Sequence, residues 1–313
     1  MAVGARPLVP SRLAPGGITG HSSLRTPRSR LGGYIALTKP RIIELLLVTT
    51  LPTMVVAKQG WPGARLMALT LAGGTLAAGG ANAINMYVDR DIDALMPRTQ
   101  GRPLVTGLIT PRAALTFALA LEAAAFVLLA LTVNLLSAVL ALAATLFYVF
   151  VYTMWLKRTS TRNIVIGGAA GAVPVLVGWS AVTNSLGAAP FVLFAGMFFW
   201  TPPHFWALAI RYADDYRAAS VPMLPAVADL RVVSRRMLMH TCLMLACFTA
   251  LGPVAHLGWL YGISSTVLGI AFLVAVLAVV RTPTPAKAMR LFGFSITYVT
   301  LLFAAMAADV FVR

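Results

Sequence analysis

The stretch RLMALTLAGGTLAAGGANAINMYVDRDID, residues 65–93, decides the fold. Residues 65–86 form an apolar run, and about 20 such residues are enough to cross the ~30 Å hydrocarbon core of a bilayer as one α-helix. The run ends in Asp89, Asp91 and Asp93, although the whole chain has only nine Asp and Glu against 25 Lys and Arg. The stretch therefore predicts a membrane-spanning helix with carboxylates gathered at its polar end.

The rest of the chain has the composition of a membrane protein. Of its 313 residues, 59% are hydrophobic and 11% are charged, whereas a soluble domain carries roughly 25% charged residues. The mean hydropathy is +0.84. We expect an all-α fold of nine transmembrane helices, at approximately residues 38–57, 65–86, 112–131, 134–155, 163–183, 189–210, 236–256, 259–280 and 289–310.

The basic residues predict how the helices are oriented. Of the 25 Lys and Arg, 22 lie in the N-terminal segment or in the connections after the second, fourth, sixth and eighth spans. Basic loops stay on the cytoplasmic side of a membrane, so we expect the N-terminus inside and the C-terminus outside. This distribution also accounts for the formal net charge of +16 without a nucleic-acid partner.

Residues 1–33 differ from the rest of the chain. They are rich in Arg, Pro, Gly and Ser, contain no acidic residue and lack the apolar core of a secretory signal peptide. We predict a disordered, basic cytoplasmic tail over residues 1–33, followed by one membrane domain over residues 34–313. An organelle transit sequence shares the Arg-rich, acid-poor bias and is the alternative.

Polar residues of the opening stretch share one helix face. At about 100° per residue, Asn85, Asp89 and Asp93 lie one above another, with Asn82 just above them. Asp91 points nearly opposite and is expected to be solvated. An amide and two carboxylates suit Mg²⁺, which prefers oxygen ligands and is commonly held by one or two carboxylates plus substrate phosphates. The alternative is that the aspartates only solvate a helix end.

The connection after the sixth span repeats this arrangement in HFWALAIRYADDYRAASVPMLP, residues 204–225. If the helix continues through Asp215, then His204, Arg211 and Asp215 share a face, with His204 about 16 Å deeper than Asp215. Asp214 lies to one side but could reach the same cavity. Tyr216 could bind phosphate or belong to an interfacial aromatic belt.

Basic residues accompany both acidic loops. Arg98 and Arg102 follow the first acidic stretch, and Lys157 and Arg158 lie in the connection after the fourth span. They could neutralise phosphate oxygens beside the carboxylates, or serve only as positive-inside anchors. Acidic stripes and basic loops on one face of an apolar bundle suggest an amphiphilic substrate, with a diphosphate head at the surface and a lipid tail among the helices.

Several segments resemble one family. NAINMYVDRDIDALMPRTQGRPL (82–104), YTMWLKRTSTRNIVIGGAAGAVP (152–174) and TPPHFWALAIRYADDYRAASVPMLP (201–225) resemble the protohaem IX farnesyltransferases, or haem O synthases, of the UbiA-type intramembrane prenyltransferases. LTKPRIIELLLVTTLP (37–52) is similar to the start of their first span. The Asn-x-x-x-Asp-x-x-x-Asp pattern marks the superfamily, and TPPHFWALA with DDY…VPMLP is specific to the haem branch. The resemblance runs from about residue 34 to the C-terminus.

The resemblance implies nine helices around a central cavity and transfer of farnesyl from farnesyl diphosphate to the 2-vinyl group of haem B. Water addition then gives haem O for haem-copper terminal oxidases, with a downstream haem-oxidising enzyme as a suggested partner.

The resemblance also implies Mg²⁺ as cofactor, with haem B as a substrate. The implied ligands are Asn85, Asp89, Asp93 and Asp215, and the implied catalytic residues are Asp89, Asp93, Asp215 and Arg102. The implied substrate-binding residues are Asn82, Asn85, Lys157, Arg158, Arg211, Asp214, Tyr216 and His204.

Two positions stay open within this resemblance. Other members carry Asp-x-x-x-Asp in the second motif, but here Ala219 stands four residues after Asp215, so the number of metal ions at that motif is open. His204 could face the haem ring or position the water, or it could be a structural histidine beside Pro202 and Pro203.

Two other functions are alternatives. One is prenyl transfer to a quinone or chlorophyll precursor, which the haem-branch motif disfavours. The other is a non-catalytic haem carrier or transporter, which should have a cavity open to both faces, whereas the polar residues here gather on one face. We expect a multi-pass protein of the bacterial plasma membrane with its active site on the cytoplasmic side, and the mitochondrial inner membrane is the alternative.

Overall fold

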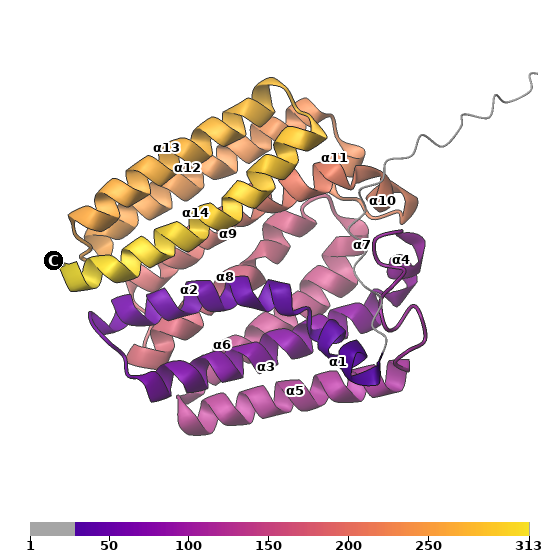
Figure 1. Cartoon of the computed structure of the whole chain (residues 1–313), viewed down its shortest axis with the longest axis horizontal. Coiled ribbons are helices and arrows are strands. Elements are labelled where there is room, and N and C mark those ends of the chain that lie inside the picture. Colours follow the sequence, from indigo (N-terminus) through magenta and orange to yellow (C-terminus); the bar gives the residue numbers. More distant parts are fainter. Residues whose placement is uncertain (1–28, 313) are drawn as a thin grey trace, which may run out of the picture.

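The computed structural model describes residues 29–312, and within this range the chain folds into helices and connections without a β-strand (Figure 1). Nine helical segments of the described chain are long and apolar enough to cross a membrane, as predicted. They are α2 (Pro40–Lys58), α3 (Ala64–Val88), α5 (Pro111–Thr132), the continuous segment Leu135–Thr159, α8 (Asn163–Thr183), α9 (Ala188–Arg211), α12 (Leu230–Val254), α13 (Trp259–Arg281) and α14 (Pro285–Val312). The fourth of these segments combines α6 (Leu135–Leu146), a π-helix η1 (Phe147–Leu156) and α7 (Lys157–Thr159).

The largest difference from a predicted boundary is at the start of the seventh span. The seventh span begins at Leu230 and not at residue 236. Its first turns contain Arg231, Arg235 and Arg236, which reduce the local hydropathy although long basic side chains can reach water from a helix end. Asp229 caps the helix, because its carboxylate accepts a hydrogen bond of 2.6 Å from the backbone N–H of Arg231.

Short helices gather at one end of the bundle (Figure 1). They are α1 (Arg30–Thr38), α4 (Arg90–Leu95), α10 (Ala213–Ala218) and α11 (Leu224–Val227). They come from the N-terminal segment and from the connections that follow the second and sixth spans. This end of the molecule therefore holds both acidic motifs.

Helix α1 moves the boundary of the predicted tail. It begins at Arg30, inside the segment 1–33 that the composition assigns to a disordered tail. Ser29 caps it by accepting a hydrogen bond of 3.1 Å from the N–H of Gly32, and Leu37 is fully buried. Residues 1–28 of the predicted tail lie outside the described residues.

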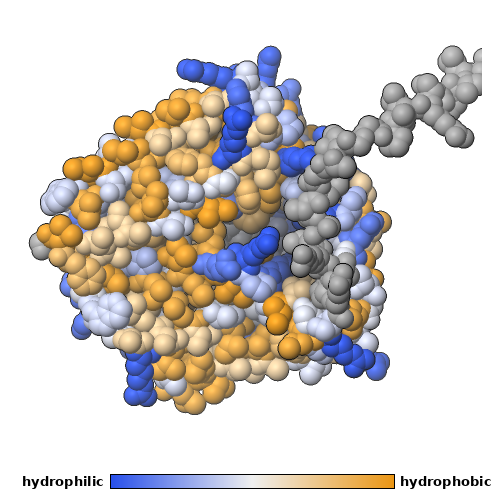
Figure 2. All heavy atoms as spheres, in the orientation of Figure 1, coloured by the Kyte–Doolittle hydropathy of each residue, from blue (hydrophilic) through white to orange (hydrophobic). Residues whose placement is uncertain are grey.

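Helix α9 lies at the centre of the larger apolar core, where it packs against α8, α12 and α14. A second packing group forms where α3 lies against α5. Figure 2 shows apolar residues over much of one face of the bundle, with hydrophilic residues at its edges and a further hydrophilic group beside a hollow near its middle. In the described chain, large side chains such as Leu131, Trp259 and Val267 are exposed, as expected where helices meet lipid.

We predict that Asp309→Ala destabilises the end of the bundle opposite the short helices. The Asp309 carboxylate is buried in α14 and accepts hydrogen bonds from the backbone N–H groups of Gly258 (2.5 Å) and Tyr261 (3.0 Å) at the start of α13. Losing such a cap costs about 1–2 kcal/mol, so the detergent-solubilised variant should melt at a lower temperature. Asp309→Asn, which keeps one acceptor oxygen, should lose less. Equal melting temperatures for the wild type and the Ala variant would contradict the assignment.

Candidate active site

The first acidic motif lies where α3 passes into α4. The N–H of Asp89 donates to the carbonyl of Asn85 (2.9 Å) and the N–H of Asp93 donates to the carbonyl of Asp89 (2.8 Å), so helical spacing continues across the junction. Asn85, Asp89 and Asp93 therefore lie one above another on a single face. All three are buried. Asn82, one turn before them, donates from its amide to the carbonyl of Thr38 (3.0 Å) and ties α3 to the end of α1.

Basic side chains from the loop after α4 and from α7 meet these carboxylates. Lys157 Nζ forms an ion pair with Asp89 Oδ2, and an Arg102 guanidinium nitrogen donates to Asp93 Oδ2 (2.5 Å). A guanidinium nitrogen of Arg158 lies 3.7 Å from Asp89 Oδ1. The structure therefore brings together the carboxylates and cations that the sequence predicts for a diphosphate site.

A fourth basic residue, Lys39, is not indicated by the sequence patterns. Its ammonium donates to Asn85 Oδ1 (2.7 Å) from the junction between α1 and α2. Lys39 has a left-handed backbone, φ 52° and ψ 63°, which turns the chain between the two helices. Desolvation at this enclosed position, with further repulsion from Arg102 and Lys157, lowers the pKa of Lys39 to about 7. In sequence, this lysine resembles any positive-inside anchor before an apolar run.

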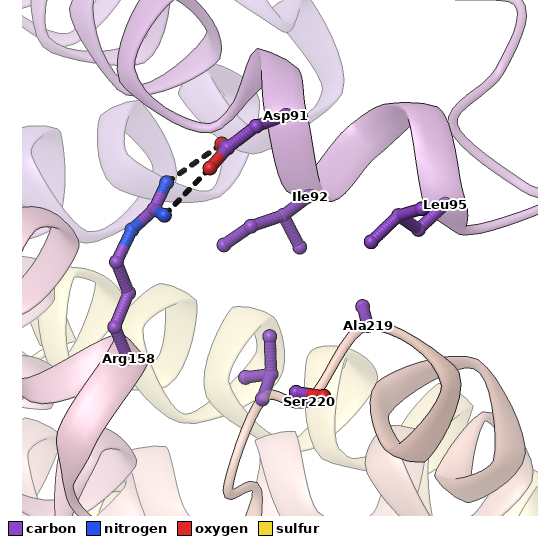
Figure 3. Close-up of a pocket in the computed structure, with 7 residues that line it drawn as sticks. Asp91, Ile92, Leu95, Arg158, Ala219 and Ser220 are labelled. Atoms are coloured by element: carbon purple, nitrogen blue, oxygen red, sulfur yellow. Dashed lines mark hydrogen bonds and ion pairs between the residues drawn. The ribbon is translucent and has the colours of Figure 1, made fainter.

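Asp91 is exposed, as expected, but it is also paired. The Arg158 guanidinium donates to both of its carboxylate oxygens, at 2.7 and 2.8 Å, and also to the carbonyl of Val88 (3.1 Å). These hydrogen bonds from Arg158 lower the pKa of Asp91 to about 2. The pair lines a cleft of about 250 Å³ between α4 and the connection after α10 (Figure 3). Asp91 therefore fixes Arg158 beside the buried motif.

The second acidic motif is joined to the first by Arg98. The Arg98 Nε lies 3.8 Å from Asp215 Oδ2, and a terminal guanidinium nitrogen donates to the Tyr216 hydroxyl (3.2 Å). The same guanidinium lies over the rings of Tyr212 and Tyr216, 5.5 and 5.3 Å from their centroids. Arg98 thus holds Asp215 and Tyr216 close to the loop that follows the first motif.

The condition for a stripe through Asp215, that the sixth span stays helical to that residue, is not met at one position. Helix α9 ends at Arg211, Tyr212 has φ −111° and ψ 25°, and α10 begins at Ala213. The Arg98 cation packs on the Tyr212 ring at this break. Arg211 is exposed and does not continue a stripe with Asp215. Asp214 also points outward, with 94% of its side chain exposed and an ion pair to Arg217.

His204 lies in an aromatic slot between α9 and α14. Its ring stacks on Trp200 and Phe292, with centroid distances of 4.2 and 4.6 Å. The Ser295 hydroxyl donates to the carbonyl of Phe292 (2.6 Å), so the 2.5 Å contact between His204 Nδ1 and Ser295 Oγ has the imidazole as donor. These contacts hold the histidine firmly in the core, and a role towards substrate stays a prediction.

The first motif fits a hard cation. Asp89 Oδ1 and Asp93 Oδ1 are buried and have no hydrogen-bond partner within residues 29–312, and orphaned buried oxygens of this kind require an explanation. In the same range, no three His, Cys, Asp or Glu side chains are grouped closely enough to hold a metal by themselves. Mg²⁺ commonly takes one or two carboxylates and completes its shell with water and substrate phosphates, which matches this donor set.

Solved structures share the fold at low sequence identity. A digeranylgeranylglyceryl phosphate synthase superposes with a TM-score of 0.74 and 17% identity, over 90% of this chain and 98% of that chain. A UbiA homologue from Aeropyrum pernix gives 0.69 and 21%, over 86% and 98%. A UbiA homologue from Archaeoglobus fulgidus, bound to GPP and Mg²⁺, gives 0.63 and 18%, over 88% and 99%.

Relatives found by sequence are much more similar to this chain than these solved structures are. The chain is 53% identical over 310 residues to the protoheme IX farnesyltransferase of a Parafrankia species, covering 98% of this chain and 97% of the relative. It is 51% identical over 291 residues to the protoheme IX farnesyltransferase of Streptomyces avermitilis, covering 91% and 95%. The model of the UbiA prenyltransferase family matches residues 46–304. With its fold, its motif geometry and this match, the chain belongs to the UbiA prenyltransferase family.

Proposed function

We propose that this chain transfers the farnesyl group of farnesyl diphosphate to the 2-vinyl group of haem B, with addition of water, to give haem O. The acceptor follows from relatives that are about half identical over nearly their full length and are named protoheme IX farnesyltransferase. One observation carries the diphosphate half of the reaction. Two buried carboxylates each have one orphaned oxygen, and cations from three connections surround them.

We propose that Asn85, Asp89, Asp93 and, across the mouth, Asp215 hold Mg²⁺ together with the diphosphate. Bound there, Mg²⁺ would neutralise charge on the leaving diphosphate. A UbiA homologue of the same fold has been solved with GPP and Mg²⁺ bound, which supports a metal-dependent reaction of a prenyl diphosphate. Lys157 and Arg102 now pair with the carboxylates, and we infer that they turn to phosphate oxygens when the metal enters.

The residues support ionisation of the prenyl donor. The allylic C1–O bond breaks and its electron pair leaves with the diphosphate, where Lys39, Arg102 and Lys157 stabilise the growing negative charge. The apolar helices shield the resulting cation from bulk water. The terminal vinyl carbon of haem B then forms the new C–C bond, and a water adds to the cation left beside the haem ring and loses a proton. His204 is a candidate for positioning haem or this water.

We further propose a bacterial plasma membrane location with the N-terminus and the active site on the cytoplasmic side. The acidic motifs and the short helices lie at the end of the bundle that carries most of the basic residues, in agreement with the positive-inside rule. The relatives compared above are bacterial. Haem O is a substrate for further oxidation, so an enzyme that oxidises haem is the expected downstream partner.

The direct test is to incubate the purified protein with haem B, farnesyl diphosphate and Mg²⁺ and to determine the masses of the extracted haems. We expect a hydroxyethylfarnesyl adduct that disappears when a chelator removes Mg²⁺ and returns when Mg²⁺ is restored. Prenylation of a quinone precursor but not of haem B would favour the alternative acceptor. Haem binding without any adduct, in protein that binds farnesyl diphosphate, would favour a carrier.

A further inference from the structure

Basic residues gather where α12, α13 and α14 reach the end of the bundle that holds the short helices. Helix α12 begins at this end, directly after α11, α13 ends there and α14 begins there, and α13 packs against both of the others (Figure 1). These residues, named here the basic cluster, are Arg231, Arg235, Arg236, Arg281, Lys287 and Arg290. Three helix ends therefore bring six positive charges to one end of the bundle.

The basic cluster has no acidic partner in the described chain. Between residues 230 and 308 the sequence contains no Asp or Glu, and within residues 29–312 none of the six takes part in an ion pair. The carboxylate of Asp229, just before α12, caps that helix. By contrast, Arg102 and Lys157 of the candidate active site both pair with buried carboxylates. The cluster thus carries positive charge that carboxylates of the described chain do not pair with.

Helix α13 shows how the cluster is connected to the lipid-facing surface. Ile263, Ile270 and Val274 are 58%, 59% and 60% exposed. At about 100° per residue, these side chains and Arg281 lie on the same face of the helix. An exposed apolar stripe therefore runs along α13 and ends in an exposed arginine.

Helices α12 and α14 repeat this pattern. Met239 and Leu243 are exposed and share one face of α12 with Arg236. In α14, the exposed Leu301 lies on the same face as Arg290. On all three helices, an apolar surface suited to lipid chains leads to a basic side chain at the helix end.

An anionic phospholipid has the matching combination of groups. Its phosphate would accept hydrogen bonds from guanidinium groups, and its acyl chains would lie along the apolar stripes. Basic clusters at the membrane boundary attract anionic lipids in this way. A free phosphate ion or an acidic soluble protein would meet the charges but would leave the stripes unused, so the pattern favours a lipid.

We propose that the basic cluster and the stripes of α12, α13 and α14 bind anionic phospholipid in the leaflet at this end of the bundle. A headgroup phosphate placed between two helix ends would join basic side chains that otherwise repel each other. The bound lipid would in this way stabilise the packing of α12, α13 and α14. This inference does not depend on prenyl transfer.

The first test counts bound lipids by native mass spectrometry. The purified protein is placed in micelles with equal amounts of phosphatidylglycerol and phosphatidylcholine that have the same acyl chains. We expect the wild type to retain phosphatidylglycerol about 10-fold over phosphatidylcholine, and Arg236→Gln/Arg281→Gln to lower this preference to about threefold or less. Arg41→Gln/Arg112→Gln removes as many charges from exposed positions at the same end of the bundle and is the matched control. No preference in the wild type, or an equal loss in the control, would overturn the proposal.

A second test uses the unaltered protein, so it does not depend on whether a variant folds. Phosphatidylglycerol should raise the melting temperature more than phosphatidylcholine does, and the difference should shrink as the salt concentration rises from about 0.05 to about 0.5 M. Inorganic phosphate at the same concentration should give no such rise, because it has no acyl chains. Equal protection by inorganic phosphate, or no difference between the two lipids, would contradict a lipid site. Neither test uses haem or farnesyl diphosphate, so this inference and the proposed function can fail separately.

Discussion

Asp89→Asn and Asp93→Asn are each expected to lower farnesyl transfer by about 1,000-fold or more while leaving the protein folded. Each substitution preserves side-chain size and one acceptor oxygen but removes a negative charge. Asp89 and Asp93 are buried, and each has one carboxylate oxygen paired to a basic residue and the other without a hydrogen bond. Removing either charge would leave Lys157 or Arg102 without its partner and would weaken the proposed metal site.

Asp91→Asn is the matched control for this prediction. It is the same chemical change on the same short helix, but the Asp91 side chain is 61% exposed and pairs with Arg158 at the surface. We expect it to retain most of its turnover, since exposed ion pairs contribute little stability. The measurement is the rate of adduct formation at several Mg²⁺ concentrations. Near-normal turnover in Asp93→Asn with unchanged Mg²⁺ dependence would contradict the proposed ligand set.

The membrane fold is largely predictable from the sequence because each span can be recognised by its length and hydropathy. The nine predicted runs correspond to nine helical segments of the described chain. The first motif is predictable for a similar reason, since Asn85, Asp89 and Asp93 have the i, i+4, i+8 spacing that an α-helix places on one face. The short helix junction at Asp89 preserves that spacing.

Local departures from α-helical geometry could not be predicted. The π-helix segment FYVFVYTMWL is hydrophobic on every side, so it carries no periodicity that would distinguish π-helical from α-helical turns. The break at Tyr212 also has no sequence signal, and the contact found there, Arg98 over the Tyr212 ring, comes from a distant connection. Both features change which residues face the site.

The location of Lys39 beside the first motif is a further feature that could not be predicted from the sequence. Lys39 is 46 residues from Asn85, the residue that accepts its hydrogen bond, and a second hydrogen bond, from Asn82 to the carbonyl of Thr38, joins α3 to the end of α1 beside it. The left-handed backbone at Lys39 is also unusual for a residue other than glycine. The lysine is therefore placed beside the carboxylates by the fold of the N-terminal segment.

Lys39→Met is expected to weaken binding of the diphosphate by about 10- to 100-fold, because it removes a buried cation beside Asn85 and keeps a side chain of similar length. The measurement is calorimetric titration with inorganic pyrophosphate and Mg²⁺, together with KM for farnesyl diphosphate. Arg41→Met, two residues further on and exposed, is the control and should bind pyrophosphate as the wild type does. Unchanged pyrophosphate affinity in Lys39→Met, with a lowered melting temperature, would make Lys39 a purely structural partner of Asn85.

A double substitution shows whether Lys39 and Lys157 act on the same group. Lys39 pairs with Asn85 and Lys157 with Asp89, one helical turn apart, and the two ammonium groups are close enough for Lys157 to repel the charge of Lys39. Two ammonium groups can lie this close only where anions offset their repulsion. We therefore expect one bound diphosphate to contact both lysines. The loss of pyrophosphate affinity in Lys39→Met/Lys157→Met should therefore differ from the sum of the single losses by at least about 0.5 kcal/mol. Strict additivity would mean that the two lysines contact separate ligands, and only one of them would then belong to the diphosphate site.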